Sequence, residues 1–279
     1  MCVTKSEQLT VDYKRATELV AMLDKSFKEK QGVLSEQDDL VENQMPQGVK
    51  KLSKEHACFL FYTVLNDHGT KSSSMYSKAK NLYVNCPNYF CPEWIVNNFD
   101  EEKIPEILNK ISKPLGARYP HALAKSWYYN SVKIVNEYQG NPLLLFNACN
   151  DAEELLERIK SFKGYGPKIG GMLLRTIIGL GFNNDLYNVD KVLVPVDIHD
   201  SRILFLTNVF KLNCTYGDSV NYYNYVKEAQ ITILSACNNN NIDWLDVDRA
   251  LWLIGSRGCV FHRCSVCPIN NMCSTMASN

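Results

Sequence analysis

Residues 155–175 read LLERIKSFKGYGPKIGGMLLR, two stretches of helical character separated by two glycines one residue apart. Apolar side chains in the first stretch recur every three to four residues, which predicts an amphipathic helix. At Gly164 and Gly166 the backbone is free to adopt positive φ angles and to approach a partner closely. Pro167 is well tolerated in the first turn of a helix, so we expect the second helix to begin at about Lys168.

A helix that starts directly after such a turn presents unpaired backbone N–H groups, and these attract anions. Lys163 and Lys168 add positive charge on either side of the glycines, which makes a DNA phosphate the natural ligand. An ordinary turn between two helices that ends in a glycine cap has the same composition. The residues of the turn alone therefore leave a structural and a DNA-binding interpretation open.

Apolar residues recur at helical spacing along most of the chain, and we predict an all-α fold. The first stripe runs over residues 9–27, from Leu9 to Phe27. Residues 31–50 lose the period and are predicted to form a linker, whereas 192–196 are expected to be an extended connection. Further helices are expected at residues 122–138, 200–210, 219–237 and 246–256.

Composition sets limits on the class of protein. With 279 residues, 46% of them hydrophobic, the chain has ample material for a buried core. Its 30 basic and 30 acidic side chains cancel, which argues against binding by non-specific phosphate attraction alone but leaves room for a local basic face. Neither a signal peptide nor an apolar run of membrane-spanning length is expected, so we predict an intracellular protein without a membrane partner.

Four of the eleven cysteines lie within fifteen residues at the end of the chain. Their spacing is Cys259-x4-Cys264-x2-Cys267-x5-Cys273. In a reducing compartment such cysteines are thiols or metal ligands rather than disulfides. Four thiolates at this spacing suit either a tetrahedral zinc ion or a 4Fe–4S cluster.

The segment Gly164-Tyr165-Gly166-Pro167-Lys168 resembles the helix-hairpin-helix motif of DNA repair proteins. Residues 55–275 are similar to the endonuclease III superfamily of DNA glycosylases, whose bifunctional members carry a catalytic lysine after this turn, at the position of Lys168. The segment VPVDIHDSR, which begins at Val194, looks like the family segment with the catalytic aspartate and places Asp197 there. An aspartate before a helix is also a common N-cap.

The resemblance extends to the cysteines, which are similar to the iron–sulfur loop of endonuclease III and of MutY-like adenine glycosylases. The first spacing differs, because the family has six residues where this chain has four. The connection from Lys168 to Asp197 is longer than in endonuclease III, and His68 stands where that family has a glutamine that fills the gap left by a flipped base. The DNA contacts that the resemblance implies are Lys163, Gly164, Tyr165, Gly166, His68, Arg257 and Arg263. Aromatic residues such as Trp127, Tyr128, Tyr129 or Tyr165 are further candidates for stacking on the flipped base or the backbone.

Together these features predict two helical lobes with a DNA cleft between them and with Lys168 and Asp197 on its opposite walls. The lobes are expected at residues 59–190 and 191–279, with residues 1–58 as an extension that packs with the second. The expected function is a monomeric glycosylase and AP lyase that acts on double-stranded DNA with a damaged base of open identity. A glycosylase without lyase activity, and a non-catalytic DNA-binding module with structural zinc, are the alternatives.

Overall fold

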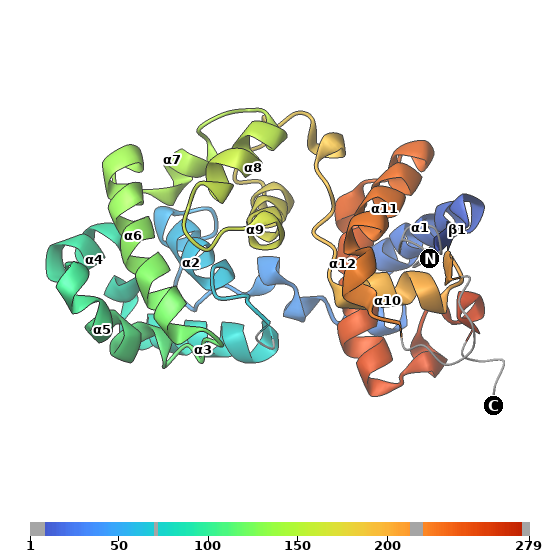
Figure 1. The fold of residues 1–279 in the computed structure, drawn as a ribbon, viewed down its shortest axis with the longest axis horizontal. Helices are drawn as coiled ribbons and strands as arrows, with labels where there is room; N and C mark the ends of the chain where they lie inside the picture. Colours follow the sequence, from blue (N-terminus) through green and yellow to red (C-terminus); the bar gives the residue numbers. More distant parts are fainter. Residues whose placement is uncertain (1–8, 70–71, 213–219, 275–279) are drawn as a thin grey trace, which may run out of the picture. The chain divides into compact units, whose positions relative to one another are not determined.

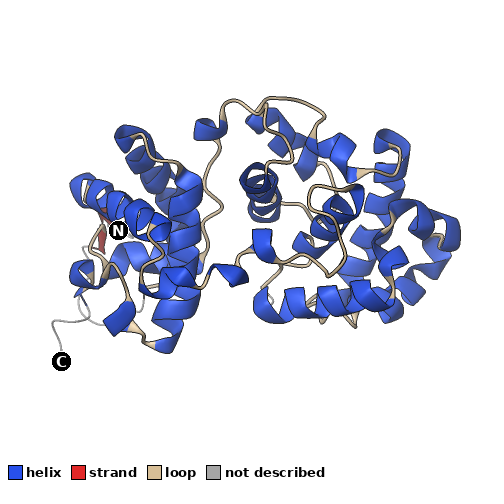
Figure 2. Ribbon diagram, turned by 180° about the vertical axis from the view of Figure 1, so that it is seen from behind, coloured by secondary structure: helices blue, strands red, loops and turns tan. Residues whose placement is uncertain are grey.

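A computed structural model describes residues 9–69, 72–212 and 220–274, and these residues form helices almost throughout (Figures 1 and 2). The predicted all-α class is therefore confirmed. Two short strands, Leu9–Val11 (β1) and Phe210–Leu212 (β2), pair antiparallel. None of the helices in the described ranges is long and apolar enough to cross a membrane.

The chain divides into two compact units. One unit combines the segment up to Gln37 with the segment from Leu193 onward, and the other is Asp38–Val192. The hairpin and Lys168 belong to the continuous unit, whereas Asp197 and the four clustered cysteines belong to the unit that joins both ends of the chain.

The continuous unit, Asp38–Val192, is built around one largely buried helix, α2 (Lys54–Val64). Nine consecutive residues, from His56 to Val64, are buried, so α2 is covered on all sides. It packs against α3, α7 and α9, and its Tyr62 ring stacks on Trp127 with the ring centres 4.4 Å apart. The other helices of this unit are α3 (Ser72–Asn85), α4 (Pro92–Asn98), α5 (Ile104–Ile107), α6 (Pro120–Tyr138), α7 (Pro142–Phe146), α8 (Ala152–Lys160) and α9 (Pro167–Leu180).

The unit that joins the chain ends is a cluster of four helices followed by the cysteine segment. Its helices are α1 (Tyr13–Lys28), α10 (Ile198–Leu206), α11 (Val226–Asn240) and α12 (Trp244–Leu253). Both α1 and α10 pack against α11 and α12. Helix α12 continues into a π-helical turn, Ile254–Gly258, and three short 3₁₀ turns then carry the cysteines.

The N-terminal segment differs from the predicted helix and linker. Leu9 lies in β1, opposite Leu212, so the prediction that the first helix includes Leu9 was wrong. Asp12 caps α1 by accepting a hydrogen bond from the Arg15 N–H at 2.9 Å, and the helix begins one residue later. Residues 32–43 form short 3₁₀ turns, and Val33 and Leu34 are fully buried. This stretch therefore packs into the core instead of acting only as a linker.

Candidate functional site

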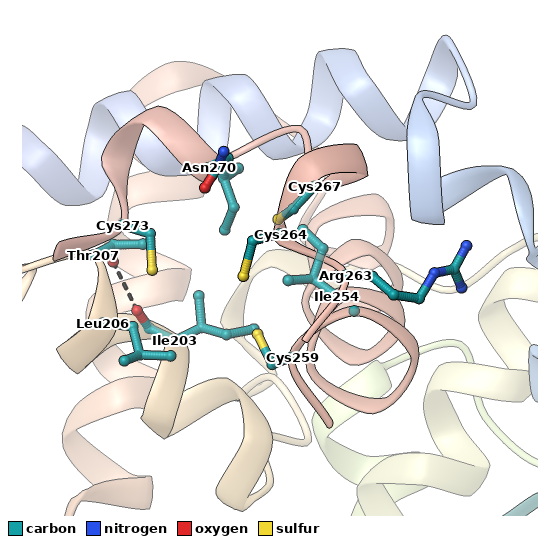
Figure 3. Close-up of a pocket in the computed structure, with 12 residues that line it drawn as sticks. Ile203, Leu206, Thr207, Ile254, Cys259, Arg263, Cys264, Cys267, Asn270 and Cys273 are labelled. Carbon is teal, nitrogen blue, oxygen red and sulfur yellow. Dashed lines mark hydrogen bonds between the residues drawn. The ribbon is translucent and has the colours of Figure 1, made fainter. Parts of the chain in front are cut away.

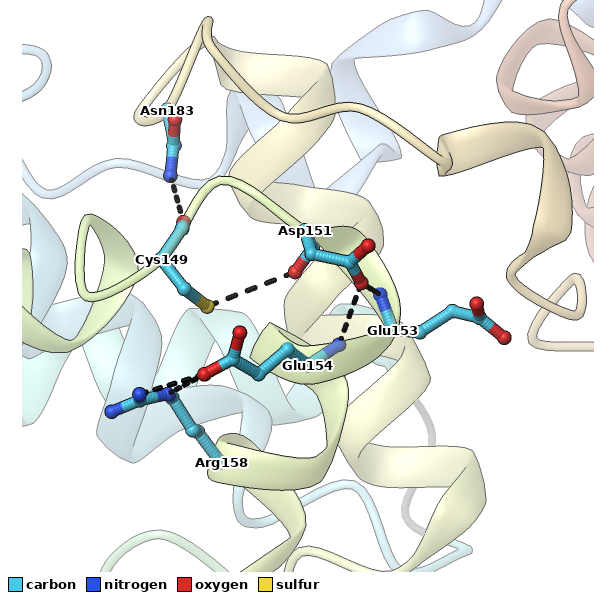
Figure 4. Close-up of polar contacts among 6 residues, drawn as sticks. All are labelled: Cys149, Asp151, Glu153, Glu154, Arg158 and Asn183. Atoms are coloured by element: carbon cyan, nitrogen blue, oxygen red, sulfur yellow. Dashed lines mark hydrogen bonds and ion pairs between the residues drawn. The ribbon is translucent and has the colours of Figure 1, made fainter.

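The helix before the hairpin, α8, begins at a carboxylate cap. Asp151 Oδ1 accepts hydrogen bonds from the N–H groups of Glu153 and Glu154 at 2.9 and 3.0 Å (Figure 4). A carboxylate at this position also interacts favourably with the positive end of the helix dipole. Its second oxygen accepts from Asn188 Nδ2 at 2.6 Å. Because Asn183 Nδ2 also donates to the Cys149 carbonyl at 3.0 Å, the loop after α9 is held against the start of α8.

The two hairpin glycines have different environments. Gly164 has a φ of +87°, and a methyl group built on it would lie 2.8 Å from Leu65 Cδ1. Both backbone conformation and packing therefore require glycine there. Gly166 has an ordinary φ of −77°, is exposed, and has no neighbouring atom within 4 Å of a Cβ at that position. Nothing within the described protein requires glycine at Gly166, so a bare backbone there leaves room for a ligand.

The turn is held rigidly by Asn130 of α6. Asn130 is buried; its Nδ2 donates to the Lys163 carbonyl at 2.9 Å, and its Oδ1 accepts from the Lys163 N–H at 2.8 Å. The Lys163 ammonium lies 4.5 Å from the centre of the Tyr129 ring. A buried amide that is bonded twice to one residue fixes the backbone just before the glycines. Lys163 and Gly164 are thereby presented in one conformation.

Tyr165 and Lys168 point to different environments. The Tyr165 side chain is buried, with its ring 5.2 Å from that of Phe61 and its hydroxyl donating to the Phe61 carbonyl. Its side chain belongs to the core, which leaves only its backbone for a DNA contact. Trp127, another candidate for stacking, is fully buried as well. Lys168 is exposed at the second position of α9, directly after Pro167.

His68 lies near the hairpin, although 96 residues of chain separate it from Gly164. Both residues line one cavity of about 140 Å³, together with Ser126, Arg118 and Tyr119. The Arg118 guanidinium is 5.5 Å from the centre of the exposed Tyr119 ring. The structure therefore brings together His68 and the hairpin, as two predicted DNA contacts, and adds Arg118, which no local sequence signal distinguished.

Asp197 occupies the N-cap of α10. Its Oδ1 accepts hydrogen bonds from the N–H groups of His199 and Asp200 at 2.6 and 3.4 Å. In return, Asp200 Oδ2 accepts from the Asp197 N–H at 2.7 Å, which completes a reciprocal capping box. Residues 193–196 before it form neither helix nor strand, the Val196 N–H donates to the Val194 carbonyl at 2.8 Å, and Gln230 of α11 donates to the same carbonyl at 2.7 Å. These bonds fix both the backbone and one carboxylate oxygen of Asp197.

Arg202, one turn further along α10, connects this helix to the cysteine segment. Its Nη2 lies 3.2 Å from His199 Nδ1 and donates to the Gly255 carbonyl at 3.2 Å. Burial raises the pKa of the Cys259 thiol, and the charge of Arg202 and a hydrogen bond from it act in the opposite direction. Arg202 therefore bridges the helix of Asp197 and the first cysteine, a role that the sequence did not indicate.

The four clustered cysteines line one cavity (Figure 3). The sulfur atoms of Cys259, Cys264, Cys267 and Cys273 turn toward the space between them. Much of the remaining wall is apolar and is formed by the side chains of Ile203, Leu206, Ile254 and Ile269. Within the described ranges, no three His, Cys, Asp or Glu side chains converge on a position for a single metal ion.

The chemistry of this cavity suits a thiolate-bound iron–sulfur group. Burial raises the pKa of Cys267 to about 11, while the Ile269 N–H donates to its sulfur and opposes that rise. A buried thiolate needs a compensating positive charge, and a metal centre supplies one. Hydrogen bonds to the sulfurs and an apolar wall are the surroundings that tune and protect such clusters. The residues present therefore fit the group that the resemblance implies.

The N-terminal segment packs directly against the cysteine segment. Arg15 of α1 donates to the Met272 carbonyl at 2.9 Å and, through its Nε, to the Thr207 carbonyl at the end of α10. Arg263 forms an ion pair of 2.6 Å with Glu36, so this predicted DNA contact is engaged within the protein. Arg257, the other arginine predicted to contact DNA, is half-buried in the π-helical turn.

Helices α8 and α9 are joined by a Gly-x-Gly turn within an all-α chain. No protein-family model and no curated protein sequence matches the chain. Among solved structures, the chain is similar to a trapped covalent intermediate of endonuclease III and DNA, the estranged-adenine complex. The TM-score is 0.57 over 95% of this chain and 97% of that chain, at 15% sequence identity. The chain therefore has an endonuclease III-like fold.

Proposed function

We propose that this protein is a base-excision repair DNA glycosylase with AP lyase activity. The observation that carries the proposal is the hairpin: an exposed glycine at Gly166, which nothing in the protein requires, next to the exposed Lys168. It occurs in a fold shared with endonuclease III, and Asp197 follows in the order that the resemblance implies. Double-stranded DNA with a damaged base is the proposed substrate.

In this proposal, the first turn of α9 binds a DNA phosphate. The first N–H groups of an α-helix have no partner within the helix, and the bare backbone at Gly166 lets a phosphate approach them. Lys163, fixed by Asn130, adds positive charge to the same turn. His68, which shares a cavity with Gly164, is proposed to contact the duplex where the damaged base leaves the stack.

The proposed chemistry assigns one role to each of two residues. Cleavage of the bond between base and sugar develops positive charge on the sugar, which the Asp197 carboxylate stabilises. The Lys168 amine attacks C1′ of the sugar as the base leaves, and it loses a proton; the C1′–O4′ bond then breaks, O4′ takes up a proton as a hydroxyl, and a Schiff base forms. Loss of a proton from C2′ then allows β-elimination of the 3′-phosphate. Hydrolysis of the remaining imine returns the lysine amine.

We further propose that Cys259, Cys264, Cys267 and Cys273 hold a 4Fe–4S cluster. The support is that four cysteine sulfurs, which are soft metal ligands, line one cavity with apolar walls. Hydrogen-bond donors also reach the sulfurs of Cys259 and Cys267. When bound, the cluster joins segments around Cys259 and Cys273 in one rigid unit. Its proposed role is structural.

Borohydride trapping tests the lyase assignment. The protein is incubated with a duplex that contains one abasic site, and borohydride reduces any imine to a stable amine. We expect a covalent protein–DNA adduct with the wild type and none with Lys168→Gln. Lys163→Gln is the matched control, because it removes a lysine from the same turn; it should weaken binding and keep the adduct. An undiminished adduct with Lys168→Gln would sink the lyase assignment.

Release of free base tests the glycosylase assignment separately. A panel of duplexes, each with one lesion, is assayed with and without strand cleavage. Asp197→Asn removes the charge that stabilises the sugar cation and should lower base release by about 10²–10³-fold. Base release without any adduct would indicate a glycosylase that uses only the aspartate. No release from any duplex would indicate a binding module.

Metal analysis tests the cofactor. We expect about four iron atoms and as many labile sulfides per chain in the anaerobically purified protein. Cys264→Ser should lower both together. One zinc ion per chain, without iron or sulfide, would contradict the cluster and favour a structural zinc site.

A further inference from the structure

Two carboxyl groups meet at the start of α10. Asp197 and Asp200 exchange hydrogen bonds through the capping box, so each carboxyl has one oxygen engaged by the other residue's backbone N–H. The two side chains are also within hydrogen-bonding reach of each other. Asp200 is 3% exposed, whereas Asp197 is half-exposed. The pair therefore has one solvent-facing member and one buried member.

The buried member has an oxygen without a hydrogen-bonding partner. Asp200 Oδ1 is inaccessible to water, and no donor among the described residues reaches it. An ionised carboxylate that is buried in this way is strongly disfavoured unless it is paired with a positive charge. Asp197 and Asp248 of α12 add negative charge near it. Burial first, and these two charges next, hold the pKa of Asp200 well above its usual range.

We propose that Asp200 is a neutral positioning acid for Asp197: its Oδ1–H donates a hydrogen bond to the Asp197 carboxylate. The pair then carries one proton and one negative charge. A donor bonded to one oxygen of the Asp197 carboxylate keeps that carboxylate in one orientation. This inference rests on the proposed function, in which Asp197 must present a carboxylate to the sugar. Asp200 itself need not touch the DNA.

The charged groups around the pair determine how it responds to pH. His199 and Arg202 lie on the same helix, and Arg202 is directed toward Gly255 and His199. From α12 comes Asp248, and from α11 the uncharged Gln230, which binds the segment before Asp197. Removing the proton from Asp200 at high pH would place two negative charges in contact and remove the donor to Asp197. Base release should therefore decline on the alkaline side.

The first test is spectroscopic and requires no substrate. An infrared difference spectrum between the wild type and Asp200→Asn at neutral pH should contain the carbonyl band of a protonated carboxylic acid. The band should shift in deuterium oxide and disappear as the alkaline decline sets in. Asp243→Asn, which removes the capping carboxylate of α12, is the matched control and should give no such band. A spectrum without the band at Asp200 would overturn the proposal.

The second test compares pH profiles of base release under single-turnover conditions. In Asp200→Asn, the amide nitrogen can donate to the Asp197 carboxylate and the amide oxygen can still accept from the Asp197 N–H. This variant should therefore release base at the wild-type rate at neutral pH and lack the alkaline decline. Asp200→Leu should lower base release about tenfold to 10²-fold, the loss of one hydrogen bond to a charged group. Superimposable profiles of the wild type and Asp200→Asn would overturn the proposal, whether or not Asp200→Leu folds. The acid band without base release from any duplex would instead count against the proposed function alone.

Discussion

Replacing Gly255 by alanine is expected to displace the first turn of α10, which carries Asp197. A methyl group built on Gly255 lies 2.6 Å from His199 Cβ and 3.3 Å from His199 Cγ. Carbon atoms in a packed interior are separated by about 3.5–4.0 Å. His199 must therefore move by about 1 Å, and Asp197 is bonded to its N–H.

The size of the effect follows from that displacement. Overpacking a well-packed site costs about 1–3 kcal/mol, so the free energy of unfolding should fall by that amount. A misplacement of about 1 Å at a catalytic group can cost about 10²-fold in rate. Because Gly255 has no positive φ, the change is purely steric. Gly258 provides the matched control, since a methyl group there meets Val33 Cγ2, Val33 Cγ1 and Ile254 Cγ2 at 3.7, 3.8 and 3.9 Å, all ordinary contacts.

The assay combines denaturant unfolding with single-turnover base release from the duplex that the lesion panel selects. Gly255→Ala should lose stability and base release, and Gly258→Ala should keep both close to the wild-type values. DNA affinity through the hairpin should be unchanged in both variants, because the hairpin lies in the other unit. Equal stability and equal rates for the two variants would refute the steric reasoning.

Three further predictions concern other parts of the molecule. Gly164→Ala should lower the free energy of unfolding by about 1–3 kcal/mol because of its positive φ and its close neighbour, whereas Gly166→Ala should leave stability unchanged and weaken DNA binding; equal binding by Gly166→Ala and wild type would contradict the phosphate site. Burial lowers the pKa of His56 from 6.5 to about 4, so the unfolded chain binds more protons between these values, and stability should fall by about 3 kcal/mol as pH drops from 6.5 to 4. His56→Asn should flatten this decline in pH-dependent unfolding measurements, and an unchanged slope would contradict the assignment. Gly32→Ala places a methyl group 1.8 Å from the Val266 carbonyl oxygen, so the purified variant should retain less iron than wild type; equal iron content would show that the contact does not support the cysteine segment.

The parts of the fold that the sequence predicted are those set by local interactions. The Gly-x-Gly turn and the start of α9 after Gly166 can be predicted from neighbouring residues in the sequence, and both are confirmed. The Asp151 cap is equally local, since its bonds reach two and three residues ahead. Capping and turn chemistry are readable because the partner atoms lie within one helical turn.

Features that depend on distant segments were missed. The strand at Leu9 needs Leu212 as its partner. A strand of three residues is also too short for its alternation to be told apart from helical spacing. The Tyr165 hydroxyl finds its acceptor at Phe61, so nothing near Tyr165 in the sequence indicated that its side chain is buried. Arg118 and His68 come from different segments and meet only in the folded cavity.

Helix α10 connects the cysteine cavity to Asp197, so the structure around the cysteines affects the proposed chemistry at Asp197. Helix α10 begins at the Asp197 cap and ends at residues that line the cavity, Ile203, Leu206 and Thr207. Nine helical residues span only about 13 Å, and a helix transmits displacement of one end to the other. Arg202 adds a second connection, from His199 to Gly255 and Cys259. Whatever fills the cavity therefore fixes the position of α10, and with it the orientation of the Asp197 carboxylate.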